Sequence, residues 1–345
     1  MKIDAFDYDL PPEAIAQEPL PERDASRLLV LDRAGGPDQH RVFHELPDLL
    51  DPGDLLVVNR TRVFPARLLG RRAGGGAAEV LLLRELDGAG LWEAFVRPGR
   101  RLRAGHTVEI ADGFRVRVVG EAVPPDGRRR VALEAEGQGV AAALERFGHV
   151  PLPPYVRRAD EPRDRERYQT IYARESGSVA APTAGLHFTP ALRERLAQRG
   201  IGWTEVLLHV GPGTFRPVAV DEIADHRVAA EPFEVPPDAA AAVAQARRRG
   251  GRVVAVGTTS VRALEAAAAP DRRVEARRGE TELVIAPGYR FAVVDALITN
   301  FHLPRSSLLL LVAGLAGRER ILDAYAEALR RGYRFYSYGD AMLIV

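Results

Sequence analysis

Residues 65–136 carry a different apolar pattern from the rest of the chain, and this contrast limits the possible folds most. Their apolar segments are short and partly alternating, which is typical of half-buried strands. Turn signals separate them, with DG at 87–88 and 112–113, PGR at 98–100 and PDG at 125–127. Closely spaced strands with such turns predict a small antiparallel barrel or sandwich. The expected strands are 78–86, 91–98, 106–110, 114–123 and 129–137.

From residue 170 onward, short apolar segments alternate with helical patterns. This alternation predicts a largely parallel or mixed sheet covered by helices. Thr189 suits a helix N-cap, Pro190 the first helical position and Gly200 the stop. The expected strands are 178–182, 203–210, 252–257, 281–286, 291–299 and 334–345, and the expected helices are 190–199, 237–249, 261–268, 306–317 and 318–331.

The segments 26–33 and 54–64 near the start of the chain also have the composition of buried strands. We therefore expect an α/β protein whose main domain is discontinuous and has a mixed sheet, formed by residues 1–63 and 151–345. A small antiparallel β-barrel-like domain is expected as an insertion at 64–150, closed by a helix at 139–148.

Composition excludes several classes of protein. The chain has no cysteine, which excludes disulfides, thiol catalysis and cysteine-ligated metals. A net charge of +1 means that a polyanion must bind a local patch. Nearly all positive charge is arginine, which suits phosphate and carboxylate, although biased codon usage would also explain it. Without a signal pattern or an apolar run near the ~20 residues that span a bilayer, we expect a cytoplasmic protein with no membrane partner.

Three histidines lie at or after the ends of predicted strands: His187, His209 and His302. Because ligands gather at the carboxyl ends of strands in open α/β sheets, one pocket could collect all three rings. Each could instead be a buried, hydrogen-bonded core histidine. The H-E-x-x-H and H-x-H patterns of metal sites are missing, so we expect no metal and favour neutral imidazoles that exchange protons near pH 7.

Other polar residues lie at comparable positions. Thr258, Thr259 and Ser260 form a turn that leads into a predicted helix, with Arg262 near its start. The N-terminus of this helix would bind an anion, although simple capping also explains the hydroxyls. Aromatic and acidic side chains in the last predicted strand suggest a wall for a cation or a base, or else core packing. These last residues are Tyr336, Tyr338 and Asp340.

Eight segments of the chain, quoted in order, resemble one known family. They are DYDLPPEAIAQEPLPERDASRLLVLDR, DLLVVNRTRVFPARL, GHVPLPPYVRR, RYQTIYARESGSVAAPTAGLHFTP, HVGPGTFRPV, AVGTTSVRALE, ALITNFHLPRSSLLLLV and YRFYSYGDAMLI. Over nearly its whole length the chain resembles the S-adenosylmethionine:tRNA ribosyltransferase-isomerases of queuosine biosynthesis. The inserted β region resembles the family mainly in its placement.

The resemblance implies a reaction and its partners. The family moves the ribosyl part of S-adenosylmethionine onto 7-aminomethyl-7-deazaguanine at the wobble position of a tRNA. The sugar rearranges to give epoxyqueuosine, and adenine and methionine leave. The family uses no metal and no cofactor, since S-adenosylmethionine is consumed as a substrate. We expect a monomer.

The resemblance also suggests roles for residues. His187, His209 and His302 would share the proton transfers that this chemistry needs, with Asp340 or Glu280 as an orienting acid. The hydroxyl-rich helix start with Arg262 would hold the methionine carboxylate, and Tyr336 or Tyr338 would face the sulfonium or adenine. Thr183, Thr214 and Asn300 are further candidates for substrate binding. Arg60, Arg62 and Arg67 would hold tRNA phosphate or substrate.

Two other readings remain open at this point. One is a metal-assisted hydrolase built on the three histidines. The other is a non-catalytic RNA-binding protein that uses the β region as a platform.

Overall fold

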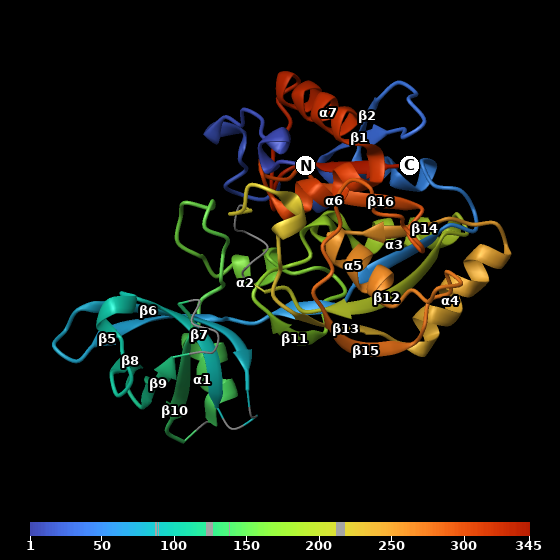
Figure 1. Cartoon of the computed structure of the whole chain (residues 1–345). Helices are drawn as coiled ribbons and strands as arrows, with labels where there is room; N and C mark the ends of the chain where they lie inside the picture. The colour runs from blue at the N-terminus through green and yellow to red at the C-terminus, as the bar shows by residue number, and fades with distance from the viewer. Residues whose placement is uncertain (87, 89, 122–126, 138, 212–217) are drawn as a thin grey trace.

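The computed structural model describes residues 1–345 except 87, 89, 122–126, 138 and 212–217. A nine-stranded mixed sheet with helices forms the main body, and a closed antiparallel barrel lies beside it. Figure 1 shows the barrel at the lower left and both chain termini on the body. The expected fold class is therefore confirmed. The boundaries proposed for the two domains stay a prediction.

The sheet of the body places four parallel strands at its centre. These are β12, β3, β14 and β16, so their carboxyl ends meet at one edge. β17 then runs antiparallel to β16. In spatial order the strands are β15 (Arg277–Thr281), β13 (Glu231–Val235), β12 (Gly202–Leu208), β3 (Leu55–Asn59), β14 (Val253–Val256), β16 (Ala296–Asn300), β17 (Ala341–Ile344), β1 (Arg27–Leu31) and β2 (Gln39–Val42).

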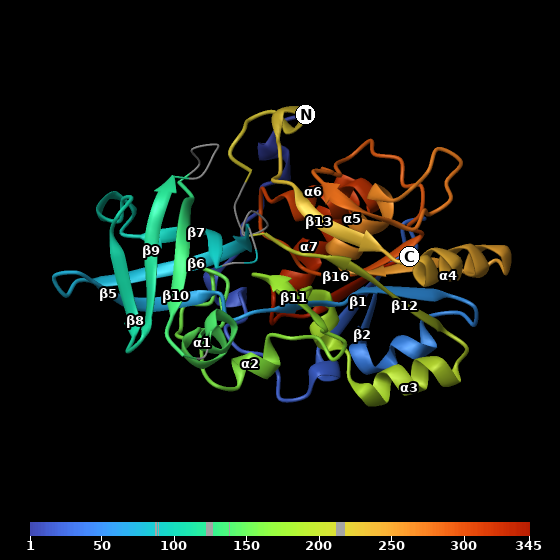
Figure 2. The same ribbon diagram turned by 90° about the horizontal axis from the view of Figure 1, so that it is seen from below.

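Helices cover both faces of this sheet (Figure 2), which explains why β3 and β14 are buried along their whole length. One face packs against α4 (Pro237–Arg248), α5 (Thr258–Ala266), α6 (Ser307–Ala316) and α7 (Arg318–Arg330). The other packs against α3 (Pro190–Gln198) and two 3₁₀ helices, Phe43–Asp48 and Thr183–His187. The Oγ of Thr189 accepts from the Leu192 amide, which confirms the predicted N-cap of α3.

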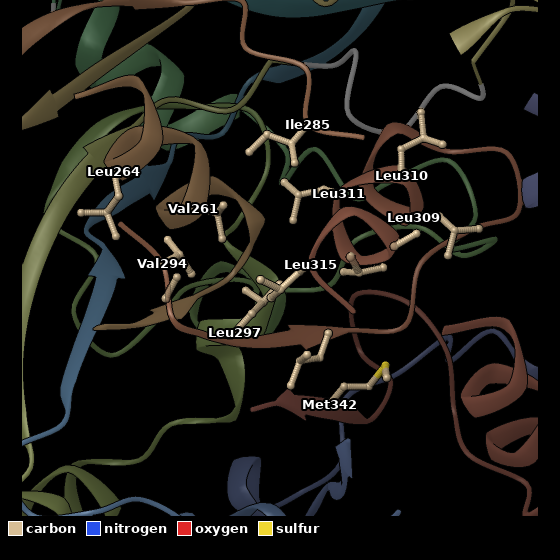
Figure 3. Close-up of a cluster of buried hydrophobic side chains, with 14 of the residues drawn as sticks. Val261, Leu264, Ile285, Val294, Leu297, Leu309, Leu310, Leu311, Leu315 and Met342 are labelled. Carbon is tan, nitrogen blue, oxygen red and sulfur yellow. The ribbon is translucent and has the colours of Figure 1, made fainter. Parts of the chain in front are cut away.

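The apolar contacts under α5 and α6 fix where the N-terminus of α5 lies. Val261 and Leu264 of α5 lie near leucines of α6, above Leu297 of β16 and Met342 of β17 (Figure 3). Each fully buried aliphatic side chain contributes about 1.5–3 kcal/mol. This packing holds the first turn of α5 at the carboxyl edge of the sheet, directly after β14.

The barrel consists of strands that alternate between a buried and an exposed face, as the sequence pattern predicts. Val80, Leu82, Val116, Val118 and Val131 fill its interior. Helix α1 (Gly139–Phe147) packs against it. The strands are β5 (Arg67–Arg72), β6 (Ala77–Glu85), β7 (Leu91–Arg97), β8 (Thr107–Ala111), β9 (Phe114–Glu121) and β10 (Arg129–Ala135), closed in the order β10-β7-β6-β5-β8-β9.

The chain enters and leaves the barrel at one point. Arg67 and His149 exchange both of their main-chain hydrogen bonds, at 3.2 and 2.8 Å. Nearby, β4 (Thr61–Val63) pairs in parallel with β11 (Glu175–Ser178). The insertion is thus tied to the body where the central strand β3 ends.

Five expected strands are wrong in their extent. The strand expected at 291–299 begins only at Ala296, and the segment 54–64 forms two strands, β3 and β4. Only Ser178 of the expected strand 178–182 lies in β11, and the expected strand 281–286 is irregular because the pairing residues are Arg277–Thr281. The last strand begins only at Ala341, since residues 333–340 turn back on themselves. A Cβ at Gly339 would lie 2.4 Å from the Arg334 carbonyl oxygen, so this close turn requires glycine.

The strands β2, β5 and β13 were not predicted from the sequence. Their segments are short or carry charged residues on the exposed face, which weakens the apolar signal. The residues Thr258–Ser260 are the first turn of α5 and do not form a separate turn before it.

Candidate functional site

A buried imidazole lies at the carboxyl edge of the sheet, next to the end of β16. The ring of His187 is 4% exposed and stacks on Phe43, with ring centroids 4.9 Å apart. Its Nδ1 lies 2.7 Å from Oγ of Ser26, and its Nε2 lies 3.2 Å from Nδ2 of Asn300. The sequence predicted His187 and Asn300 as site residues. It gave no signal for Ser26 or Phe43, which reach the ring from another part of the chain.

The hydrogen bonds of Asn300 determine the state of this imidazole. The amide nitrogen also donates to the Tyr336 carbonyl oxygen over 3.2 Å, and the amide oxygen accepts from Oγ1 of Thr183 over 2.9 Å. Because the nitrogen of Asn300 faces His187, Nε2 of the ring must accept and Nδ1 carries the proton toward Ser26. Burial, with smaller contributions from Arg334 and Arg23, lowers the pKa of His187 to about 3. The ring is neutral near pH 7.

Tyr336 lies beside this cluster in a strained backbone conformation. Its φ is +75°, which is uncommon for a residue other than glycine. The side chain is 9% exposed and meets Tyr155 edge to face, with centroids 4.0 Å apart. Such strain often lies at functional positions, because the surrounding structure must hold it in place.

The start of α5 lies close to the His187 segment. Gly257 has a φ of +85°, and a Cβ built on it would lie 3.6 Å from Cβ of Ala184, in the 3₁₀ helix that carries Thr183 and His187. Thr258 and Thr259 are 7% and 8% exposed. Within the described residues, Oγ1 of Thr259 is buried without a hydrogen-bond partner. A buried hydroxyl left unpaired costs about 1–3 kcal/mol, so it marks a place where a ligand would gain by binding.

Two other residues of this segment are already engaged. Oγ of Ser260 donates to the Val256 carbonyl over 2.8 Å, one turn back. Arg262 forms a buried ion pair with Glu231 and donates to the Leu283 carbonyl over 3.0 Å. In this structure protein groups occupy the side-chain donors of Ser260 and Arg262, so the expectation that they hold a substrate carboxylate stays a prediction without support from these contacts.

His209 lies at the end of β12, at the same edge of the sheet. Its Nδ1 is 2.8 Å from Oγ1 of Thr61, and its ring packs against Gly177, where a Cβ would clash at 2.8 Å. Burial lowers the pKa of His209, and the carboxylate of Glu175 offsets part of this effect. Thr214, a predicted substrate-binding residue shortly after His209, lies outside the described residues.

His302 lies on the opposite face of the sheet from His187. Alternation along β16 sends Asn300 toward one face and Thr299 toward the other. Oγ1 of Thr299 is 2.7 Å from Nε2 of His302, whereas Asn300 contacts His187. Burial lowers the pKa of His302 to about 3. The three histidines therefore do not converge on one pocket, because a strand lies between two of them.

The expected acidic partners also lie elsewhere. Asp340 is 2% exposed, and its oxygens accept from Nε of Arg27 over 3.2 Å and from the Arg334 amide over 2.8 Å. Its carboxylate fixes the turn before β17 and orients none of the predicted histidines. Glu280 is exposed on β15, 3.4 Å from Arg84 of the barrel.

Of the other predicted residues, Tyr338 and two arginines have structural partners. The hydroxyl of Tyr338 donates to Asp164 over 3.2 Å. Arg60 lies between Glu175 and Glu234, at 2.7 and 3.1 Å.

Arg67 pairs with Glu79 at 3.2 Å. Arg62 differs from Arg60 and Arg67, because its side chain is exposed and forms no ion pair within the described residues. Only Arg62 of these three predicted arginines therefore remains available for a phosphate.

A cavity of about 20 Å³ touches His187 and Ser26 and is lined by three arginines that the sequence analysis missed, Arg23, Arg167 and Arg334. No predicted strand ends near them, so the only sequence signal was their charge. For the described part of the chain, no three histidine, aspartate or glutamate side chains come close enough to hold a metal ion. No helix there is long and apolar enough to cross a membrane.

Comparison with known proteins gives one family. Residues 3–344 match the model of a family described as queuosine biosynthesis protein. The S-adenosylmethionine:tRNA ribosyltransferase-isomerase of Moorella thermoacetica is 56% identical, with 100% of both chains covered. The enzyme of the same name from an Anaeromyxobacter species is 55% identical over 100% of this chain and 99% of its own. The crystal structure of an S-adenosylmethionine tRNA ribosyltransferase from Thermotoga maritima is 39% identical, with a TM-score of 0.56, and covers 99% of this chain and 100% of its own.

Proposed function

Because the chain belongs to the queuosine biosynthesis protein family, we propose that the edge of the sheet between His187 and the start of α5 is the place where it performs the reaction of that family. The protein is an S-adenosylmethionine:tRNA ribosyltransferase-isomerase. It transfers and isomerises the ribosyl moiety of S-adenosylmethionine onto 7-aminomethyl-7-deazaguanine at the tRNA wobble position. Epoxyqueuosine-tRNA, adenine and methionine are the products.

This chemistry needs proton transfer at neutral pH. A proton next to the sulfonium is removed, the attacking amine loses protons, and adenine leaves more easily when it is protonated. The neutral imidazole of His187, held between Ser26 and Asn300, is the observation that carries the proposal. Its Nε2 lone pair can accept a proton once the Asn300 amide turns to the substrate. Ser26 and Asn300 act as positioning residues, because they act through the ring.

The start of α5 is suited to the methionine carboxylate. Free amides and the positive end of the helix dipole favour an anion there. Thr258 and Thr259 add hydroxyls, and Oγ1 of Thr259 has no partner within the described residues. Since Arg262 is paired with Glu231, the helix end and these two threonines supply the binding, without a guanidinium.

An aromatic surface for the sulfonium or the adenine is supplied by Tyr336 and Tyr155. Their rings lie edge to face beside the Asn300 cluster, and a ring face attracts an onium group. Thr183 fixes the orientation of Asn300 through its hydroxyl. His209, at the same edge and partly exposed, is the second candidate for proton transfer. His302 is left out, because it lies on the other face of the sheet.

The partners and the location of the protein are proposals of the same kind. S-adenosylmethionine is consumed, and we propose no resident cofactor or metal. The tRNA carries the aminomethyl precursor base at its wobble position. We propose a cytoplasmic monomer.

The decisive experiment incubates the protein with S-adenosylmethionine and tRNA that carries the aminomethyl precursor, followed by mass spectrometry of the nucleosides. We expect epoxyqueuosine together with one adenine per modified tRNA. His187→Gln should lower turnover 100-fold or more, the usual range for loss of a proton-transfer group. His106→Gln, on the exposed surface of the barrel, is the matched control. Equal turnover of both variants would remove His187 from the mechanism.

A further inference from the structure

Two adjoining hollows of the body are lined by arginines that the proposed reaction does not use. An open groove of about 860 Å³ borders α2 (Asp164–Arg167) and the start of α3, and its lining includes Arg62, Arg165, Arg23 and Arg167. The small cavity at His187 shares Arg23 and Arg167 with this groove. The two hollows therefore share two positive side chains, and the smaller one borders the imidazole.

The three arginines that line the small cavity, Arg23, Arg167 and Arg334, differ from most other arginines of the chain in their hydrogen-bond partners. Many arginines elsewhere in the chain, such as Arg158 and Arg252, bind a buried carboxylate. Within the described residues, the three that line the small cavity lack a carboxylate within 4.0 Å and donate to main-chain carbonyls. The acceptors are those of Leu186 and Glu166 for Arg23, of Leu20 and Pro21 for Arg167, and of Glu18 and Tyr338 for Arg334.

These carbonyl contacts satisfy donors but leave the positive charge uncompensated. Burial lowers the pKa of Arg23, and the charge of Arg167 lowers it further. Burial also lowers the pKa of Arg334, which Asp340 partly offsets. The Nε of Arg167 is buried with no acceptor among the described residues. An anion placed here would relieve the repulsion and accept from a free donor.

The groove contains acidic as well as basic side chains. Glu22, Asp24 and Glu166 line it together with the arginines. Asp24 accepts from the Thr189 hydroxyl over 3.0 Å, so one of these acids is partly engaged. At the outer end, Arg62 is exposed and has no ion pair within the described residues.

We propose that this arginine groove, defined by Arg62, Arg165, Arg167 and Arg23, binds phosphodiesters of the tRNA beside the modified nucleotide. The inference rests on the proposed function, which supplies the polyanion. Arginine forks bind phosphate oxygens in pairs, and phosphate contacts fix the register of a nucleic acid on a protein. The cavity of about 20 Å³ is close to the size of one water, so it admits phosphate oxygens but no nucleoside.

Salt-dependent tRNA binding tests this assignment. Each phosphate contact to a single strand contributes about 0.7 to the slope of log affinity against log salt. Arg62→Ala should therefore weaken tRNA binding about five-fold at 0.1 M salt and reduce the slope by about 0.7. Arg62→Glu should weaken it further. Arg167→Lys, which keeps the charge but loses the fork, should weaken binding while leaving the slope nearly unchanged.

Arg248→Glu is the matched control. Arg248 is exposed on α4, which lies far from α2 in both views of the molecule (Figures 1 and 2). Melting temperatures of all variants show whether each one is folded. If tRNA affinity and slope of the Arg62 variants match those of the Arg248→Glu control, the groove does not bind tRNA.

The arginines of the groove could bind either a tRNA phosphate or the methionine carboxylate of S-adenosylmethionine. The KM for S-adenosylmethionine, measured at saturating tRNA, distinguishes these two anions. We expect it to stay at the wild-type value in the Arg62 variants. A raised KM for S-adenosylmethionine with normal tRNA affinity would instead assign the arginines to the methionine carboxylate and overturn the inference. If the wild type binds tRNA with a slope that Arg62→Glu reduces but forms no epoxyqueuosine, the proposed function fails and the groove remains a nucleic-acid site.

Discussion

The side-chain amide of Asn300 donates two hydrogen bonds at once, to Nε2 of His187 and to the main-chain oxygen of Tyr336, both at 3.2 Å. The second bond fixes which end of the amide faces the imidazole. It thereby holds the proton of His187 on Nδ1, toward Ser26. The protonation state of His187 thus depends on three elements. They are the end of β16 with Asn300, the 3₁₀ helix with Thr183 and the strained turn with Tyr336.

Asn300→Asp should change this state. A carboxylate accepts where the amide donated, so it would raise the pKa of His187 and favour the imidazolium. We expect turnover at pH 7 to fall about 100-fold, with a new rise toward high pH in the kcat profile that the wild type lacks. The measurement is adenine release from pH 5 to 9. A variant with a wild-type pH profile would show that Asn300 does not control the ring.

Thr259→Val tests the free hydroxyl at the start of α5. Valine has the same shape but no hydroxyl, and Oγ1 of Thr259 has no partner within the described residues. The variant should therefore be as stable as the wild type or more so. The KM for S-adenosylmethionine should rise about 10-fold or more, as expected for loss of a hydrogen bond to a charged group of about 1.5–3 kcal/mol.

Ser260→Ala is the companion to Thr259→Val. Oγ of Ser260 donates to the Val256 carbonyl, within the helix itself. Its removal should alter the free energy of unfolding slightly and leave the KM for S-adenosylmethionine unchanged. Equal KM values for the two variants would argue against a ligand at Thr259.

His302→Gln should flatten the acid dependence of stability. The pKa of His302 is lowered by burial to about 3 in the folded protein, against 6.5 ordinarily. The contribution of the neutral His302 ring to the free energy of unfolding is therefore fully present above pH 6.5. It is lost as the pH falls toward 3, because the unfolded chain binds the proton at a higher pH than the folded protein does. The free energy of unfolding, measured with urea at pH 7, 6, 5 and 4, should decline less with falling pH in the variant than in the wild type. His187 adds a similar decline that the variant retains.

Asp54→Asn should destabilise the start of β3 in a different pH range. Burial favours the protonated form, but hydrogen bonds from Arg252 and from the main chain outweigh it and lower the pKa of Asp54. Breaking one partner of a buried pair costs about 3–5 kcal/mol at pH 7. This loss should shrink as the pH falls below the ordinary value of 3.8, because the wild type then loses the same ion pair. Asp51→Asn is the control, since Asp51 also contacts Arg252 but is 80% exposed in its side chain.

Sequence patterns predicted the architecture well where burial has a simple period. The barrel strands alternate and the central strands of the sheet are mostly apolar, so both signals are strong. The turn at 333–340 was wrongly predicted as part of a strand, because its alternating aromatic residues are typical of a half-buried strand. What breaks the strand is the close backbone approach at Gly339 and the positive φ of Tyr336, which the residue types alone do not reveal.

The site was predictable only in part. His187, Asn300, Thr183 and Thr259 could be placed together because strand ends of a parallel sheet share an edge. Asn300 and His302 would share a face if the strand continued, because side chains alternate along a strand. β16 ends at Asn300, however, and the chain beyond it brings His302 to Thr299 on the other face. That is why His302 was wrongly grouped with His187. Long-range partners such as Ser26 and Arg334 have no local signal.

The paired main chains of Arg67 and His149 bring both ends of the barrel insertion within hydrogen-bonding distance of each other. An excision that removes β5 through α1 would thus leave two ends that a linker of about three residues can rejoin. The order of strands in the large sheet would need no rearrangement. The barrel is in this sense an insertion whose two ends meet, and joining them would keep the chain path from β4 to the segment of His187 unbroken.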